Sequence, residues 1–102
     1  MLMTRRKPVS VGEILSHEFM EPMGLTQAAL AEAMGVQRKH VNELCNDRRN
    51  VTAATALILS RVFGNSPEFW LNVQRRNDLW QAMHSPKERQ RIDRAKPLTQ
   101  AV

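Results

Sequence analysis

The sequence predicts an all-α domain. Signals that start and stop helices recur along the chain, apolar residues fall between them at helical spacing, and no run alternates between apolar and polar residues as a strand would. The 102 residues lie within the usual size of one domain, and 42% of them are hydrophobic, which is enough for a single core. We expect a basic arm over residues 1–9, a helical domain over 10–83, and a charged C-terminal extension over 84–102 that can hold a short helix.

The first helix is expected over residues 11–20. Ser10 precedes it and Glu13 follows three residues later, which is the spacing of a capping box. Pro22 and Gly24 should then stop the helix. Its apolar stripe should consist of Val11, Ile14, Leu15 and Phe19.

The next two helices form the pattern of a helix-turn-helix. The second is expected over residues 27–34, capped by Thr26, and the third over about 38–45. Ala31 lies where the two helices must approach closely, and Gly35 lies in the turn, where a positive φ costs glycine almost nothing. The apolar residues that should bury one stripe of each helix are Leu30, Met34, Val36, Val41 and Leu44.

Two further helices should complete the domain. Residues 53–63 are apolar nearly all round, which is typical of a central, buried helix. Ser66 followed by Pro67 is a favoured start for a fifth helix, which should continue to about Met83. Residues 85–88 repeat the cap, proline and capping-box pattern, so a last short helix can begin there.

Long polar side chains remain on the outer face of the third helix, of the kind that reads base edges and phosphates. Arg38 and Lys39 can reach phosphates or a guanine edge, and Asn42 can pair with adenine. Glu43 can accept from cytosine or repel phosphate and set the register. The alternative is a merely solvated helix face. The residues that we expect to contact DNA are Gln27, Gln37, Arg38, Lys39, Asn42, Glu43, Arg48 and Arg49.

Charge and composition limit the classes of function that we expect for this protein. The net charge of +5 and the pI near 10.4 suit a polyanionic partner, although a basic balance also serves solubility. Cys45 is the single cysteine, so neither an internal disulfide nor a Cys-rich zinc site can form, and the three histidines share no metal-ligand spacing. With no nucleophile motif and no Gly-rich phosphate loop, we expect no enzyme activity, no metal and no cofactor. No signal peptide or apolar stretch of ~20 residues is present, so we expect a cytoplasmic protein with no membrane partner.

Two sequence blocks carry a family resemblance. Residues 12–15 read Gly-Glu-Ile-Leu and residues 21–27 read Glu-Pro-Met-Gly-Leu-Thr-Gln. Residues 66–74 read Ser-Pro-Glu-Phe-Trp-Leu-Asn-Val-Gln, and Asp-Leu-Trp follows at 78–80. Over residues 8–83 the chain resembles the HigA-type antitoxins, the VapI-like group of repressor-like (XRE) helix-turn-helix proteins. Two positions depart from the group: Gln37 replaces the usual Ser or Thr cap of the recognition helix, and Asp47 replaces a glycine.

The resemblance implies the five-helix lambda-repressor-like fold. It also implies a homodimer that binds a palindromic operator in double-stranded DNA, represses its own operon, and neutralises a small mRNA-cleaving ribonuclease toxin. Two alternatives stay open. One is a stand-alone transcriptional regulator with no toxin partner, and the other is a toxin-binding module whose DNA binding is secondary.

The fifth helix carries more large apolar side chains than one core face can bury, so some of them should meet a second surface. We expect Phe69 in the core and Trp80 nearer the interface; the alternative is that all of them pack within the monomer. The part played by the basic arm of Arg5, Arg6 and Lys7 stays open between contact with DNA or toxin and none. The residues that we expect in a dimer interface are Trp70, Leu79, Trp80 and Met83.

Overall fold

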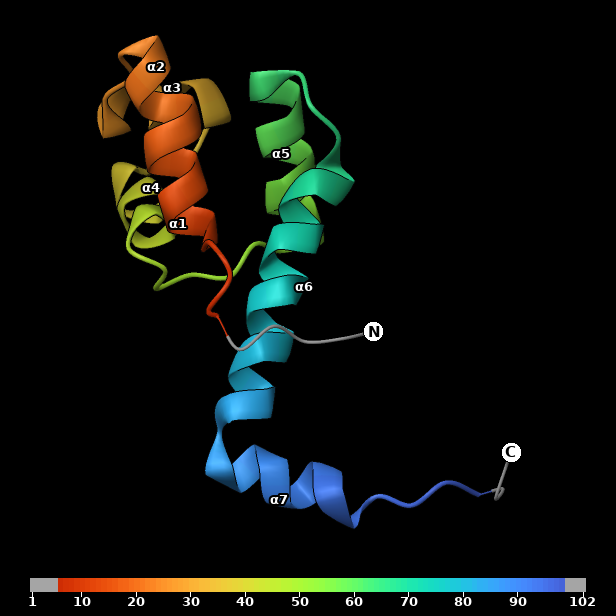
Figure 1. Ribbon diagram of the computed structural model, residues 1–102. Coiled ribbons are helices and arrows are strands. Elements are labelled where there is room, and N and C mark those ends of the chain that lie inside the picture. Colours follow the sequence, from red (N-terminus) through yellow and green to blue (C-terminus); the bar gives the residue numbers. More distant parts are fainter. Residues whose placement is uncertain (1–5, 99–102) are drawn as a thin grey trace.

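A computed structural model describes residues 6–98, and within that range every regular element is a helix. One group of helices carries the helix-turn-helix, α3 (Gln27–Met34) and α4 (Arg38–Cys45), with the first helix packed beside them. A second group pairs α5 (Ala53–Phe63) with α6 (Pro67–His84), and α7 (Pro86–Arg94) follows at the far end of α6 (Figure 1). The predicted all-α architecture is therefore confirmed.

The cap signals in the sequence correspond to the observed helix starts. Thr26, Thr52, Ser66 and Ser85 each accept a hydrogen bond from the backbone N–H three residues later, at the start of α3, α5, α6 and α7. Gln37 provides no such side-chain bond, although α4 begins directly after it. The first turn of the recognition helix is therefore left with N–H groups that its own cap does not satisfy.

The first helix is longer than predicted, and Pro22 does not stop it. Helical backbone runs through α1 (Val11–Glu13), a π-helical segment η1 (Ile14–Met20) and α2 (Glu21–Met23), and ends at the left-handed Gly24. A proline inside a regular α-helix clashes with the carbonyl four residues back. Here the backbone N–H of Glu21 bonds to the carbonyl of Ser16, five residues back, so the turn before Pro22 is wider. The widened turn lets the helix continue through the proline.

The core lies where the first helix, α3, α4, α5 and the start of α6 meet. Its largest fully buried side chains come from all of these elements and are Leu15, Leu30, Val41, Leu44, Leu59 and Trp70.

Trp70 corrects one prediction. We expected it in a dimer interface, yet its side chain is 0% exposed within the chain, and its indole N–H donates to Asn65 Oδ1 at 3.0 Å. Phe69, expected in the core, is 38% exposed at its edge. Trp70 is therefore the more buried of the two neighbours, because Trp70, Val73 and Asn77 form the stripe of α6 that faces inward.

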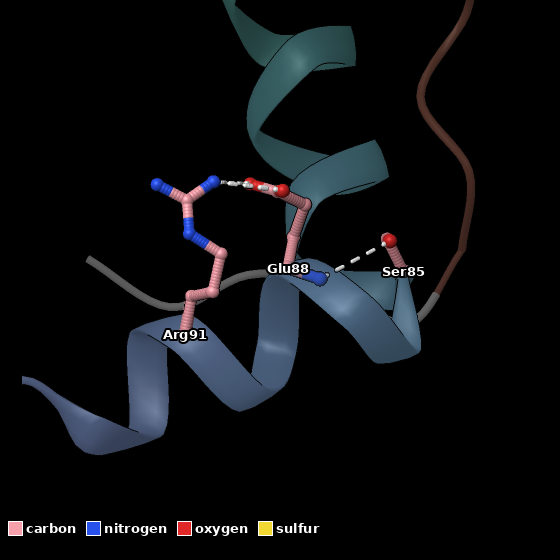
Figure 2. A network of polar contacts seen from close by, with 3 residues as sticks. All are labelled: Ser85, Glu88 and Arg91. Carbon is pink, nitrogen blue, oxygen red and sulfur yellow. Dashed lines mark hydrogen bonds and ion pairs between the residues drawn. The ribbon is translucent and has the colours of Figure 1, made fainter.

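The chain is elongated because α6 continues beyond the helices that cover its first half. The Cα radius of gyration is 16.7 Å, against about 13 Å for a compact domain of 100 residues. A sharp corner separates α6 from α7 (Figure 1). Figure 2 shows the start of α7: Ser85 Oγ accepts from the N–H of Glu88 at 3.3 Å, and Arg91 donates to the Glu88 carboxylate at 3.1 Å. The predicted short helix of the C-terminal extension is thus confirmed.

Candidate nucleic-acid interface

The recognition helix α4 is buried along one side and open along the other. Val41 and Leu44 are fully buried, whereas the polar side chains predicted to read DNA lie on the outer side. Arg38, Lys39 and Arg48 form no ion pair with any residue in the described part of the chain. None of these three charges is therefore held in an ion pair within residues 6–98.

A close backbone contact fixes the end of α4 against the first helix. A Cβ on Gly12 would lie 2.4 Å from the carbonyl oxygen of Cys45, a distance that real Cβ atoms do not reach. The backbone N–H of Gly12 also donates to Asp47 Oδ1 at 2.8 Å. Glycine at position 12 therefore lets the first helix and the recognition helix approach until their backbones touch.

Asp47 has a structural role that sequence reasoning missed. Its φ of 56° is left-handed, a conformation that glycine adopts more cheaply than aspartate. Its carboxylate, however, satisfies an N–H in the first turn of the first helix, while Ser10 Oγ satisfies the N–H of Glu13 there. The replacement of the family's usual glycine by Asp47 is the sequence signal that could have indicated this role.

Gln27 and Asn42 are brought together from the two helices of the helix-turn-helix. The Asn42 side-chain amide donates to Gln27 Oε1 at 3.1 Å. This bond leaves one N–H and the carbonyl oxygen of the Asn42 amide open, which is the donor and acceptor pair that an adenine edge needs. Gln27 is the first residue of α3, and phosphates bind readily at a helix N-terminus.

Glu43 and Arg49 bind each other through their side chains. Their side chains form an ion pair at 2.8 Å, and the hydrogen bond from Arg49 holds the pKa of Glu43 below its usual value. Arg49 is therefore less available for a phosphate than Arg48, its unpaired neighbour. Burial, and then the charge of Arg49, lower the pKa of His40 from its ordinary value, which disfavours a positive charge on this ring.

The loop after α4 is tied to α6 by a side chain that sequence reasoning did not single out. Gln74 Oε1 accepts from the N–H of Val51 at 2.8 Å. The Gln74 amide nitrogen donates to Asn50 Oδ1 at 3.3 Å and to Asp78 Oδ1 at 3.0 Å. The loop that should run beside the DNA backbone is thus held by the middle of α6.

The remaining residues predicted for a dimer interface lie on the far half of α6. Leu79 is 41% exposed, and Trp80 and Met83 are half-buried. Trp80 stacks on His84 with ring centroids 4.0 Å apart. On α7, Ile92 is 43% exposed, so the projecting end of the chain carries apolar side chains on both helices.

Other kinds of site are not found in the described residues. No group of three or more His, Cys, Asp or Glu side chains within 6–98 is placed to hold a metal ion. None of the helices in that range is both long enough and apolar enough to cross a bilayer.

The fold and the exposed face of α4 are those of a helix-turn-helix protein. Residues 17–70 match the helix-turn-helix family, which is more than half of the chain. The chain is 50% identical to antitoxin HigA-1 of Vibrio cholerae serotype O1, over 93% of this chain and 88% of that protein. Among solved structures it is similar to antitoxin GraA in complex with its operator (TM-score 0.83, 37% identity, 97% and 99% of the two chains). It is also similar to Pseudomonas aeruginosa antitoxin HigA with the higBA promoter (TM-score 0.82, 34% identity, 90% and 99%).

The chain belongs to the HigA-type antitoxin family of helix-turn-helix proteins. This confirms the family that the two sequence blocks indicated. The roles of single residues in DNA contact stay predictions, as does every dimer contact.

Proposed function

We propose that the protein is a DNA-binding antitoxin that represses its own operon. The observation that carries this proposal is the recognition helix itself, which is anchored by Gly12 and Asp47 on one side and on the other presents cations that form no ion pair within residues 6–98. Two similar structures are of antitoxins with an operator or promoter, which supports the same role here. A role at its own operon implies a cytoplasmic protein.

The DNA contacts are divided by chemistry. Gln37, at the open N-terminus of α4, and Asn42 suit base edges in the major groove. Lys39, Arg48 and the Gln27 amide suit phosphates, and Arg38 suits either. Glu43, which is paired with Arg49, serves to orient that side chain rather than to read cytosine.

A homodimer would place two recognition helices on a palindromic operator, with half-sites about 34 Å apart. We assign the dimer contact to the projecting half of α6, with Leu79, Trp80 and Met83. Apolar side chains that stay exposed or half-buried on this part of the helix support this assignment. Trp70 is left out because its side chain is buried within the protomer.

The toxin is the second partner that we propose, a small mRNA-cleaving ribonuclease. Identity of 50% to an antitoxin over nearly the whole chain supports it. The second candidate is a stand-alone regulator, because the chain is also 42% identical to a Haemophilus influenzae protein described only as an HTH-type transcriptional regulator, over 93% of this chain and 89% of that protein. Co-purification with the product of the adjacent gene separates the two. A partner that the protein inhibits favours the antitoxin, and no such partner favours the regulator.

Replacing Arg38 and Lys39 together by alanine should weaken binding to the promoter upstream of the gene by roughly thirtyfold to several hundredfold, since each lost base or phosphate contact costs about 1–2 kcal/mol. The measurement is a gel-shift titration on that promoter and on a scrambled duplex. Lys87→Ala with Arg94→Ala removes the same charge from α7 and serves as the control. Equal loss in both double variants would mean that net charge, and not the recognition helix, holds the DNA.

Replacing Leu79 by glutamate should shift the protein from dimer to monomer at micromolar concentration. Leu79 is exposed in the protomer, so the charge should disturb only an interface that buries it. Light scattering gives the mass of the variant. Leu57→Glu is the matched control, because Leu57 is 59% exposed on α5, away from the projecting half of α6. A Leu79→Glu protein that keeps the dimer mass would move the interface elsewhere.

A further inference from the structure

The basic arm before the first helix is attached to the body of the protein. The side chain of Asn77, which is only 8% exposed, donates to the carbonyl oxygen of Val9 at 2.9 Å and to that of Val73 at 3.0 Å. Pro8 and Val9 also line an apolar groove together with Ile14 and Val73. The residues just before α1 therefore follow a defined path beside α6 (Figure 1).

This path brings Lys7 to the loop that follows the recognition helix. Lys7 lines a cavity of about 190 Å³ together with Arg49 and Asn50. These two loop residues lie 42 and 43 positions later in the chain, so only the fold places them beside the arm. The arm and the loop thus form one continuous surface.

Lys7 is not held by the charges around the cavity. The two carboxylates that line the cavity keep their charge, and each already accepts a hydrogen bond from a neutral N–H donor, Asp47 from Gly12 and Asp78 from Gln74. Arg49 is paired with Glu43. Lys7 is exposed and forms no ion pair with any residue between 6 and 98.

We propose that Lys7 is a DNA phosphate-contact residue and that Asn77 positions it. The partner is the phosphate backbone of the operator, next to the phosphates that the loop after α4 approaches. An ammonium on a flexible four-carbon stem suits a phosphate as a point charge. The inference rests on the proposed DNA-binding function and extends its surface from the helix-turn-helix to the N-terminal arm, through a contact that carries no sequence information.

The first test replaces Lys7 by glutamine and measures the affinity for the promoter duplex at several salt concentrations. Each lost phosphate contact should make the plot of log K against log salt less steep, by about 0.9 per protomer bound. The affinity at 0.1 M salt should fall roughly fivefold to tenfold. A scrambled duplex should lose the same factor. Lys87→Gln, which removes one charge from α7, should leave the slope unchanged.

The second test separates positioning from charge. Asn77→Leu keeps the side-chain branching, the number of side-chain heavy atoms and the net charge but removes the donors that hold Val9. Its salt dependence should become less steep, as in Lys7→Gln. The double variant Asn77→Leu with Lys7→Gln should then show little further change in that dependence. Circular dichroism reports whether Asn77→Leu is folded; if it is not, Lys7→Gln alone decides.

The outcomes are distinct. A wild-type protein that binds neither duplex would overturn the DNA-binding proposal and this inference together. A wild-type protein that binds the promoter with a steep salt dependence, beside a Lys7→Gln variant with the same slope, would overturn only the inference and would reduce Lys7 to a solvated side chain.

Discussion

The Trp70→Ala variant is expected to lose about 4 kcal/mol of unfolding free energy, because replacing a buried Phe or Trp by alanine costs about 3–5 kcal/mol in transfer energy and cavity. Trp70 is fully buried, and its ring centroid lies 4.9 Å from that of Phe19, 5.1 Å from that of Phe69 and 6.1 Å from that of Phe63. It joins the first helix, α5 and α6. Small domains have about 5–15 kcal/mol of stability in total, so the loss would remove between about a quarter and four fifths of it.

Denaturation with urea, followed by circular dichroism, measures this effect. Phe69→Ala is the control, because Phe69 is the neighbouring aromatic residue but is 38% exposed, and we expect it to cost less than half as much. If the two variants lost equal stability, the central place of Trp70 in the core would be wrong. Because Trp70 is buried within the protomer, its loss should lower stability at every protein concentration.

Helical periodicity alone did not predict that Trp70 would be more buried than Phe69. Residues 69, 70, 71 and 73 are all apolar, so more than one stripe can be drawn through the start of α6. The burial of Asn77, one turn beyond Val73, decides which stripe faces inward. A polar residue on the inner face hides that stripe from a reading that follows only apolar residues.

Local signals predicted most of the helices because capping is a local interaction. The hydroxyl groups of Thr26, Thr52, Ser66 and Ser85 act on backbone groups three residues away, so their effect can be read from the sequence directly. Pro22 is the exception, since the π-helical turn that accommodates it depends on a shift of hydrogen-bond partners that no residue type announces.

The residues predicted to contact DNA could also be chosen from local sequence patterns. The contacts that hold the recognition helix in place could not be predicted in this way. The bonds from Gly12 to Asp47, from Val51 to Gln74 and from Asn77 to Val9 join residues that are 35, 23 and 68 positions apart. Such contacts depend on how helices meet in space. The sequence could therefore indicate which face of α4 reads DNA, while the support of that face becomes visible only in the fold.

The Gly12→Ala variant tests that support. The added Cβ would meet the backbone of Cys45 at 2.4 Å and the Asp47 carboxylate at 2.9 Å, and a backbone neighbour cannot rotate away as a side chain can. Overpacking costs about 1–3 kcal/mol, and alanine recovers up to about 1 kcal/mol through helix propensity. Because the clash is with backbone atoms we expect the upper end of that cost, a net loss of up to about 2 kcal/mol, together with a displaced recognition helix and at least tenfold weaker promoter binding by the folded fraction.

Gly24→Ala is the matched control. Its φ of 63° makes alanine cost about 1–2 kcal/mol there, yet nothing lies within 4 Å of the new Cβ. The two variants should therefore lose similar stability in urea denaturation but differ in promoter affinity measured on folded protein, because only Gly12 lies between the first helix and the end of α4. Equal promoter affinity in both would show that the backbone contact at Gly12 stabilises the domain without orienting its recognition helix.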